Sequence, residues 1–208
     1  MAVTSGPSRR EVFGLLVVAS AALLARRRPQ RFWPAMTLGL TLAGLSAVPR
    51  ARSARWRCGP RWVMAALGLG AGLHLGVRVG AGLAGRIPPL AGDLEWFRGA
   101  VSSAPTGKRA ALSVPAVLGE EIFWRSGGWV AGAGPVWRSA LGYAAAQLPT
   151  QNALVVVGAL PLGLATTWAR RRSGSLLPPV ICHLVFSEMT LAWPGLPLPS
   201  GSTRATQP

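Results

Sequence analysis

Two adjacent glutamates stand in a strongly apolar stretch of this 208-residue chain. The stretch GEEIFWRSG places Glu120 beside Glu121, and Arg125 follows four residues after the second glutamate. The pair is conspicuous because the chain has only six acidic residues, against 22 Lys and Arg. On a helix, Glu121 and Arg125 share a face, whereas Glu120 lies about 100° away from Glu121. We therefore predict a structural ion pair, Glu121–Arg125, and an unpaired carboxyl, Glu120, that can act as a general base toward water.

The residues around the two glutamates help to decide whether Glu120 and Glu121 have a catalytic function. At an interfacial helix end both carboxylates would simply be hydrated, and no function would follow. Here PAVLG precedes them, and Ile122, Phe123 and Trp124 separate them from the arginine. Ionisable residues inside a membrane are costly and usually functional, so the sequence favours a functional site.

His183 and Ser187 form a second polar pattern, in SGSLLPPVICHLVFSEM. We expect Gly174 to end one helix and Ser175 to begin the next, with two prolines in its first turn. His183 and Ser187 then share one helix face, because they are four residues apart. A buried histidine is often purely structural. This one lies in an apolar segment of a chain with only two histidines, so it is a candidate for chemistry.

Composition indicates the kind of fold that must position these residues. Half of the residues are hydrophobic, only 13% are charged, and the mean hydropathy is +0.36. Apolar runs of about 15 to 24 residues recur, and crossing a membrane takes about 20. The sequence predicts an all-α, polytopic transmembrane helical bundle. About seven membrane segments are expected, near residues 12–25, 32–48, 62–85, 111–130, 136–149, 152–169 and 176–193.

The arginines give the chain a net charge of +16. They cluster in short loops beside apolar runs, such as 26–31, 50–61 and 169–174. Arginines in such places contact anionic lipid headgroups and set topology, so we expect membrane lipids as partners and no nucleic acid. The prediction is a multi-pass protein of the cell membrane, with a cytoplasmic amino terminus favoured by a small excess of cations.

Changes in character along the chain predict four regions. Residues 1–86 hold amino-terminal membrane segments, 87–110 an interfacial amphipathic segment and linker, 111–193 the core helices, and 194–208 a flexible Pro/Ser-rich tail. Within the first region, glycines recur every fourth residue from Gly68 to Gly80. Such a ridge lets helices approach closely in a membrane, and we expect it to pack against another helix of the same chain.

Three segments of the chain resemble, in order, the motifs of the CPBP family of intramembrane proteases, also called Abi or CAAX-protease-like proteins. GEEIFWRSG resembles the EExxxR motif of the family. VWRSALGYAAAQL (136–148) is similar to the following segment, which ends in FxxxH. The stretch 158–187 is similar to the last core segment, with its basic turn, proline and HxxxN motif. The resemblance covers roughly residues 106–192.

The resemblance implies roles for matching residues. Glu120 matches the catalytic glutamate, Glu121 and Arg125 its companions, and His183 the histidine of the last motif. Two positions depart from the pattern. The stretch from Tyr143 to Gln147 stands where FxxxH is expected, so Gln147 replaces a histidine. In the last motif, Ser187 replaces an asparagine. The catalytic set is therefore predicted to be Glu120, His183, Gln147 and Ser187, supported by Glu121, Arg125 and Tyr143.

These departures bear on mechanism and on metal binding. Glutamine can hydrogen-bond a water but cannot titrate, and a serine hydroxyl can donate to a developing oxyanion. A catalytic zinc usually has three protein ligands, whereas Glu120 and His183 supply two. We therefore expect no metal cofactor, although the family is often labelled metalloprotease.

Three functions remain open at this point. The first is an intramembrane endopeptidase that acts on a peptide or protein substrate at the membrane, with prenylated proteins among the candidates. The second is an inactive pseudoprotease that serves as a membrane binding or immunity-type protein. The third is a relay for protons or solutes, which the absence of an internal sequence repeat disfavours.

Overall fold

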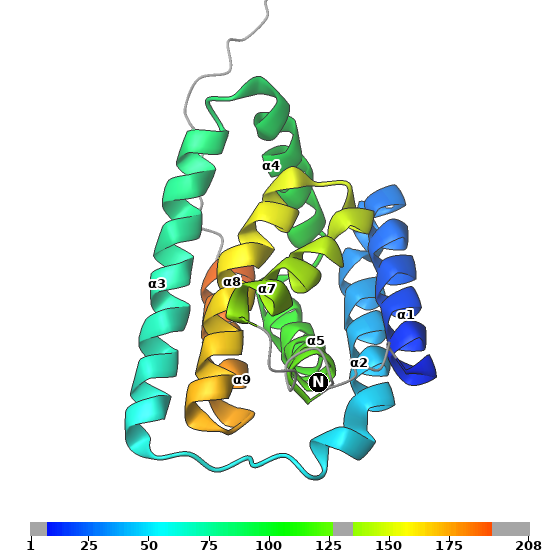
Figure 1. The fold of residues 1–208 in the computed structure, drawn as a ribbon. Coiled ribbons are helices and arrows are strands. Elements are labelled where there is room, and N and C mark those ends of the chain that lie inside the picture. Colours follow the sequence, from blue (N-terminus) through cyan, green and yellow to red (C-terminus); the bar gives the residue numbers. More distant parts are fainter. Residues whose placement is uncertain (1–7, 127–134, 193–208) are drawn as a thin grey trace, which may run out of the picture.

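The computed structural model describes residues 8–126 and 135–192. The described residues are almost entirely helical and contain no β-strand, which confirms the all-α prediction. The predicted tail, 194–208, lies outside them. The elements, in chain order, are α1 (Arg9–Arg27), η1 (Pro29–Arg31), α2 (Phe32–Ala51), α3 (Pro60–Ala84), α4 (Pro88–Val101), α5 (Thr106–Ser126), α7 (Val136–Ala145), η2 (Leu148–Thr150), α8 (Ala153–Ser173), α9 (Leu177–Ser187) and η3 (Glu188–Ala192) (Figure 1).

Three stretches of helix are long and apolar enough to cross a membrane, within the part of the chain that the structure describes: Pro29–Ala51, Pro60–Ala84 and Ala153–Ser173. The predicted number of about seven membrane segments is not confirmed. The segment expected at 136–149 forms α7, whose ten residues span only about 15 Å. The short 3-10 helix η2 begins three residues later at Leu148, with Pro149 as its second residue, and proline disfavours α-helix at the residue before it.

Helices α1 and α2 form an antiparallel pair on one side of the bundle (Figure 1). Ser8 begins α1 with a capping box, in which its hydroxyl accepts from the Glu11 amide and the Glu11 carboxylate accepts from the Ser8 amide. The same carboxylate lies 3.2 Å from the Arg50 guanidinium near the end of α2. The start of α1 is thereby fixed to the end of α2.

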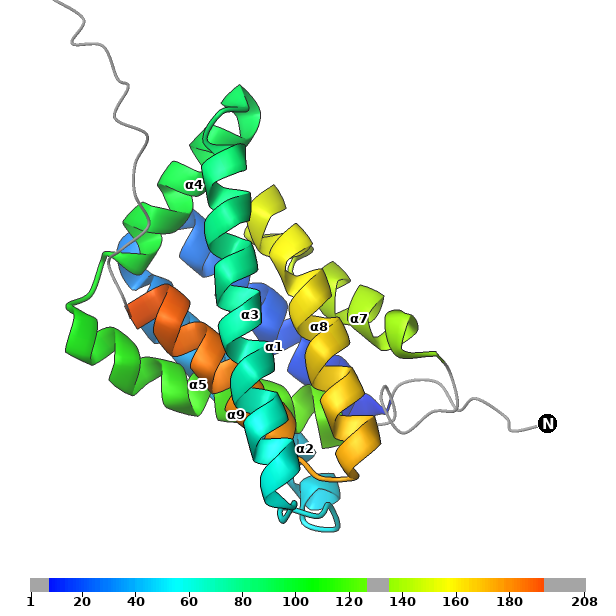
Figure 2. The ribbon, with the colours of Figure 1, turned by 90° about the vertical axis from the view of Figure 1, so that its left-hand side faces the viewer.

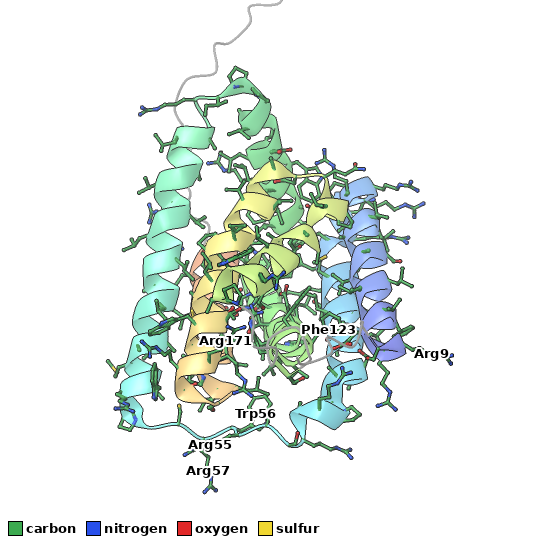
Figure 3. All side chains as sticks on the ribbon, in the orientation of Figure 1. Arg9, Arg55, Trp56, Arg57, Phe123 and Arg171 are labelled. Atoms are coloured by element: carbon green, nitrogen blue, oxygen red, sulfur yellow. The ribbon has the colours of Figure 1, made fainter. Side chains whose placement is uncertain are left out.

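Glycines allow α2 to approach α5 closely. A Cβ atom added at Gly44 would lie 2.4 Å from the Cα of Gly119, and one at Gly119 would lie 2.3 Å from the carbonyl oxygen of Leu40. Any side chain at either position would force the helices apart. Since Gly119 immediately precedes Glu120, this contact sets the position of the two glutamates. Phe123, labelled in Figure 3, fills the neighbouring space against Gly14 of α1.

A different glycine brings α3 onto α9. A Cβ atom at Gly70 would lie 2.5 Å from the Cys182 carbonyl oxygen, next to His183, and Figure 2 shows α3 running across α9. The predicted packing of the ridge from Gly68 to Gly80 is wrong, because a Cβ atom at any of its four glycines would meet nothing within 4 Å. Gly70 lies about 200° round the helix from Gly68, so α3 contacts α9 through nearly the opposite face.

The connection from α8 to α9 follows the sequence prediction. Gly174 has a φ of 67° and ends α8, a left-handed conformation that favours glycine. Two residues after Ser175, α9 begins, with Pro178 and Pro179 in its first turn. The other end of α8 is held by α4, where the Asp93 carboxylate accepts from the Ala153 amide at 2.7 Å.

Candidate active site

Helices α5 and α9 bring Glu120 and His183 together. Oε2 of Glu120 lies 3.8 Å from Nε2 of His183, although 62 residues separate them in sequence. The two residues are 6% and 5% exposed, so their surroundings are largely dry. A separation of 3.8 Å exceeds a direct hydrogen bond but allows both atoms to contact one water.

Glu121 holds the other side of the same imidazole ring. Its Oε1 atom lies 2.8 Å from Nδ1 of His183, and its Oε2 atom lies 3.2 Å from Nε of Arg125. Because an ionised carboxylate only accepts hydrogen bonds, this contact places a proton on Nδ1. In the neutral ring, Nε2 is then an acceptor that faces Glu120. The predicted Glu121–Arg125 pair is present, and its acid also orients the histidine.

Thr166 of α8 completes the support of the buried arginine. A guanidinium nitrogen of Arg125 donates to the Thr166 hydroxyl, which in turn donates to the Leu162 carbonyl at 2.8 Å. Glu121, Arg125 and Thr166 are at most 1% exposed. The histidine is thus connected through a carboxylate and a guanidinium to a third helix, and this network fixes its ring.

Gln147 and Tyr143 approach Glu120 from the α7–η2 segment. The Gln147 side-chain amide donates to Oε1 of Glu120 at 3.4 Å, and a side-chain hydrogen bond joins the Tyr143 hydroxyl to the same carboxylate. The Arg125 guanidinium also lies over the Tyr143 ring, 5.3 Å from its centroid. Gln147, which stands where the resemblance predicts a histidine, therefore contacts Glu120.

Ser187 lies one turn beyond His183 on α9 and is 2% exposed. The following residue, Glu188, begins the π-helix η3 and accepts a hydrogen bond from Ser113 of α5. Polar contacts of α5 thus extend beyond α9 to η3 and include residues outside the predicted set. Single π-helical turns are frequent at functional sites.

Two features of the site escaped the sequence analysis. Thr166 was not singled out, although Thr166 and Thr167 form a polar pair within the apolar stretch that precedes the arginines of this helix, which is the signal that would have found it. The contact between Glu121 and His183 was also missed. It depends on how α5 and α9 cross, and spacing along one helix carries no information about that crossing.

The donor set does not suit a catalytic metal ion. Among residues 8–126 and 135–192, no group of three or more His, Cys, Asp or Glu side chains is arranged to hold one. Glu120 and His183 face each other, but both oxygens of Glu121 are engaged by the imidazole and the guanidinium. A catalytic zinc usually takes three protein ligands, and this site offers two.

One comparison with known proteins gives a match. Residues 106–189 match the model of a protein family described as Rce1-like, type II CAAX prenyl endopeptidase. This segment contains Glu120, Glu121, Arg125, Gln147, Thr166, His183 and Ser187, and the match confirms the family resemblance predicted from the three motifs. No curated protein and no solved structure matches the chain significantly.

Proposed function

We propose, from the match of residues 106–189 to the Rce1-like family of type II CAAX prenyl endopeptidases, that this membrane protein cleaves peptide bonds with a glutamate-activated water. The observation that carries the proposal is the 3.8 Å approach of Glu120 and His183. A water between these atoms would donate one proton toward each and direct its oxygen at a substrate carbonyl.

The reaction requires one proton to move twice. Glu120 accepts a proton as the water oxygen attacks the carbonyl carbon, and a tetrahedral intermediate forms. The carbon–nitrogen bond then breaks, and the proton passes from Glu120 to the leaving amine. General acid–base catalysis of this kind contributes about 10²- to 10⁴-fold to a rate.

His183 orients the attacking water in this scheme. Glu121 holds Nδ1, so Nε2 is presented toward the water as a hydrogen-bond acceptor. Gln147 contacts Glu120, and its amide can also donate to the oxyanion that develops on the substrate carbonyl. We assign Ser187 a secondary role as a donor to the same oxyanion.

The substrate class follows from the family description and from the burial of the site. CAAX prenyl endopeptidases act at the membrane on peptide or protein substrates, and we propose a prenylated carboxy-terminal segment as the substrate here. We place the protein in the cell membrane with its amino terminus in the cytoplasm, the side on which the larger group of loop arginines then lies.

A pseudoprotease is the second candidate, and one observation favours it. Gln147 contacts Glu120 where the family pattern has a histidine, and an amide cannot transfer protons. A protein of this kind would bind the same peptides without cleaving them.

Cleavage in lipid vesicles distinguishes the two. A membrane-embedded peptide with a prenylated cysteine near its carboxy terminus is incubated with the purified full chain, and products are identified by mass spectrometry. We expect a single cleavage product from the wild type and none from Glu120→Gln.

The matched control is Glu95→Gln, since Glu95 is an exposed glutamate of α4. This variant should cleave the peptide like the wild type. Equal product from the wild type and Glu120→Gln would refute the proposal, and peptide binding without any product from the wild type would establish the pseudoprotease.

A further inference from the structure

A basic cavity lies at the end of the molecule where α3 begins and α8 ends. Its volume is ≈ 510 Å³, and its lining includes Arg55 and Arg61 from one segment and Arg172 and Ser173 from the end of α8. No acidic residue lines it, and the described residues pair none of the three arginines with a carboxylate. Three uncompensated guanidinium groups around one cavity attract an anion.

The backbone holds the two sides of the basic cavity together. The Leu176 amide donates to the Arg55 carbonyl at 2.9 Å, and Arg55 and Ser175 form a parallel β-bridge. Arg55 and the arginine-rich end of α8, here marked by Arg171, lie toward the same end in Figure 3. The cavity is therefore built into the fold, because main-chain bonds join the segment before α3 to the turn that leads into α9.

The amino-terminal end of α3 lies at the basic cavity, where Gly59 and Pro60 line it, and no side chain caps this helix at Gly59. The helix dipole at such a terminus favours negative charge. It supplements the charge of the three arginines.

Two tryptophans place the basic cavity at the depth of lipid headgroups. Trp62, which lines it, stacks edge-on against Trp168 of α8, with ring centroids 5.9 Å apart. Tryptophan is enriched at membrane–water interfaces, and both helices are long and apolar enough to span. Next to the cavity, α3 exposes Met64 (66%) and Leu67 (39%), an apolar surface along which acyl chains can lie.

We propose that the basic cavity binds the phosphate headgroup of an anionic phospholipid. Arg55, Arg61 and Arg172 contact the phosphate oxygens, because guanidinium groups match phosphate in charge and in hydrogen-bond geometry. Trp62 packs against the glycerol region, and the acyl chains run along the outer face of α3. The bound lipid joins the segment before α3 to the end of α8, and the turn after α8 leads into α9, the helix that carries His183.

The test measures lipid binding by the full chain and does not depend on peptidase activity. Purified protein in neutral detergent is titrated with phosphatidylglycerol and with phosphatidylcholine, and retained lipid is counted by native mass spectrometry. Since each arginine near an anionic lipid contributes modestly, three should give a preference for phosphatidylglycerol of about 10-fold or more. The variant Arg55→Gln/Arg61→Gln/Arg172→Gln should lower this preference below about 3-fold.

The control variant is Arg9→Gln/Arg52→Gln/Arg57→Gln, which removes the same charge from exposed positions outside the basic cavity. It should keep the wild-type preference. Equal loss in both triple variants, or no preference in the wild type, would overturn the proposal. A preference abolished by millimolar inorganic phosphate would also overturn it, since the ligand would then be free phosphate.

Should the first triple variant fail to fold, the three single variants Arg55→Gln, Arg61→Gln and Arg172→Gln test the site instead. Each should lower the amount of phosphatidylglycerol retained, and wild-type binding by all three would contradict the site.

Discussion

Nε2 of His183 faces Glu120 at 3.8 Å while Nδ1 of the same ring contacts Glu121 at 2.8 Å. Two neighbouring residues on one helix thus contact the two nitrogens of one imidazole on another helix. This is geometrically feasible because adjacent helical side chains diverge by about 100°. The consequence is a division of roles, in which Glu121 orients the ring and Glu120 remains available to water.

The first prediction contrasts the two glutamates in stability. Glu121→Gln should lower the stability of the protein, because removing one partner of a buried ion pair costs about 3–5 kcal/mol. Glu120→Gln should leave stability unchanged or raise it slightly, since a neutral amide avoids the cost of burying a carboxylate. Thermal unfolding in detergent measures both. Should Glu120→Gln prove the more destabilising variant, Glu120 would be the main partner of Arg125.

The second prediction concerns the contact that positions Glu120. Gly44→Val should destabilise the protein by at least about 1–3 kcal/mol, because overpacking at a helix crossing forces the backbones apart. Gly72→Val is the matched control, as a Cβ atom there meets nothing within 4 Å. Thermal unfolding of the two variants in the same detergent gives the comparison. Equal stability of both variants would contradict the close crossing of α2 and α5.

Some of this architecture follows from local sequence and some does not. The Glu121–Arg125 pair and the end of α8 at Gly174 were predictable, because both depend on helix geometry within a few residues. The contact of Glu121 with His183 was not, since it arises from the crossing of α5 and α9. The glycines from Gly68 to Gly80 illustrate the same limit: a small-residue face can be recognised in sequence, but which face meets a neighbour is decided by tertiary packing.

The third prediction restores the family pattern at Gln147. Gln147→His should raise the cleavage rate by about 10²-fold, because a titratable ring would then contact Glu120 and assist proton transfer. Adding Ser187→Asn should raise it further, since an amide reaches the oxyanion better than a hydroxyl does. Initial rates of peptide cleavage, normalised to folded protein, provide the measurement. A restored variant that is no faster than the wild type would show that Gln147 does not limit the reaction.

The fourth prediction concerns metal removal. Cleavage should persist unchanged after dialysis against a strong zinc chelator, because Glu121 is engaged by Arg125 and His183 and, among the residues that the structure describes, no third His, Cys, Asp or Glu joins Glu120 and His183 in a metal-binding group. Rates before and after dialysis, and after zinc is added back, are compared on one preparation. Activity that disappears with the chelator and returns with zinc would contradict a mechanism that uses side chains alone.

A double-mutant cycle of cleavage rates tests the central claim most directly, namely that Glu120 and His183 act on one water. Rates are measured for the wild type, Glu120→Gln, His183→Ala and the double variant, with the folded fraction of each determined separately. Residues that act as a unit show strongly non-additive losses, so the double variant should be no slower than the slower single variant. Losses that multiply in the double variant, or four equal rates, would contradict a shared catalytic site.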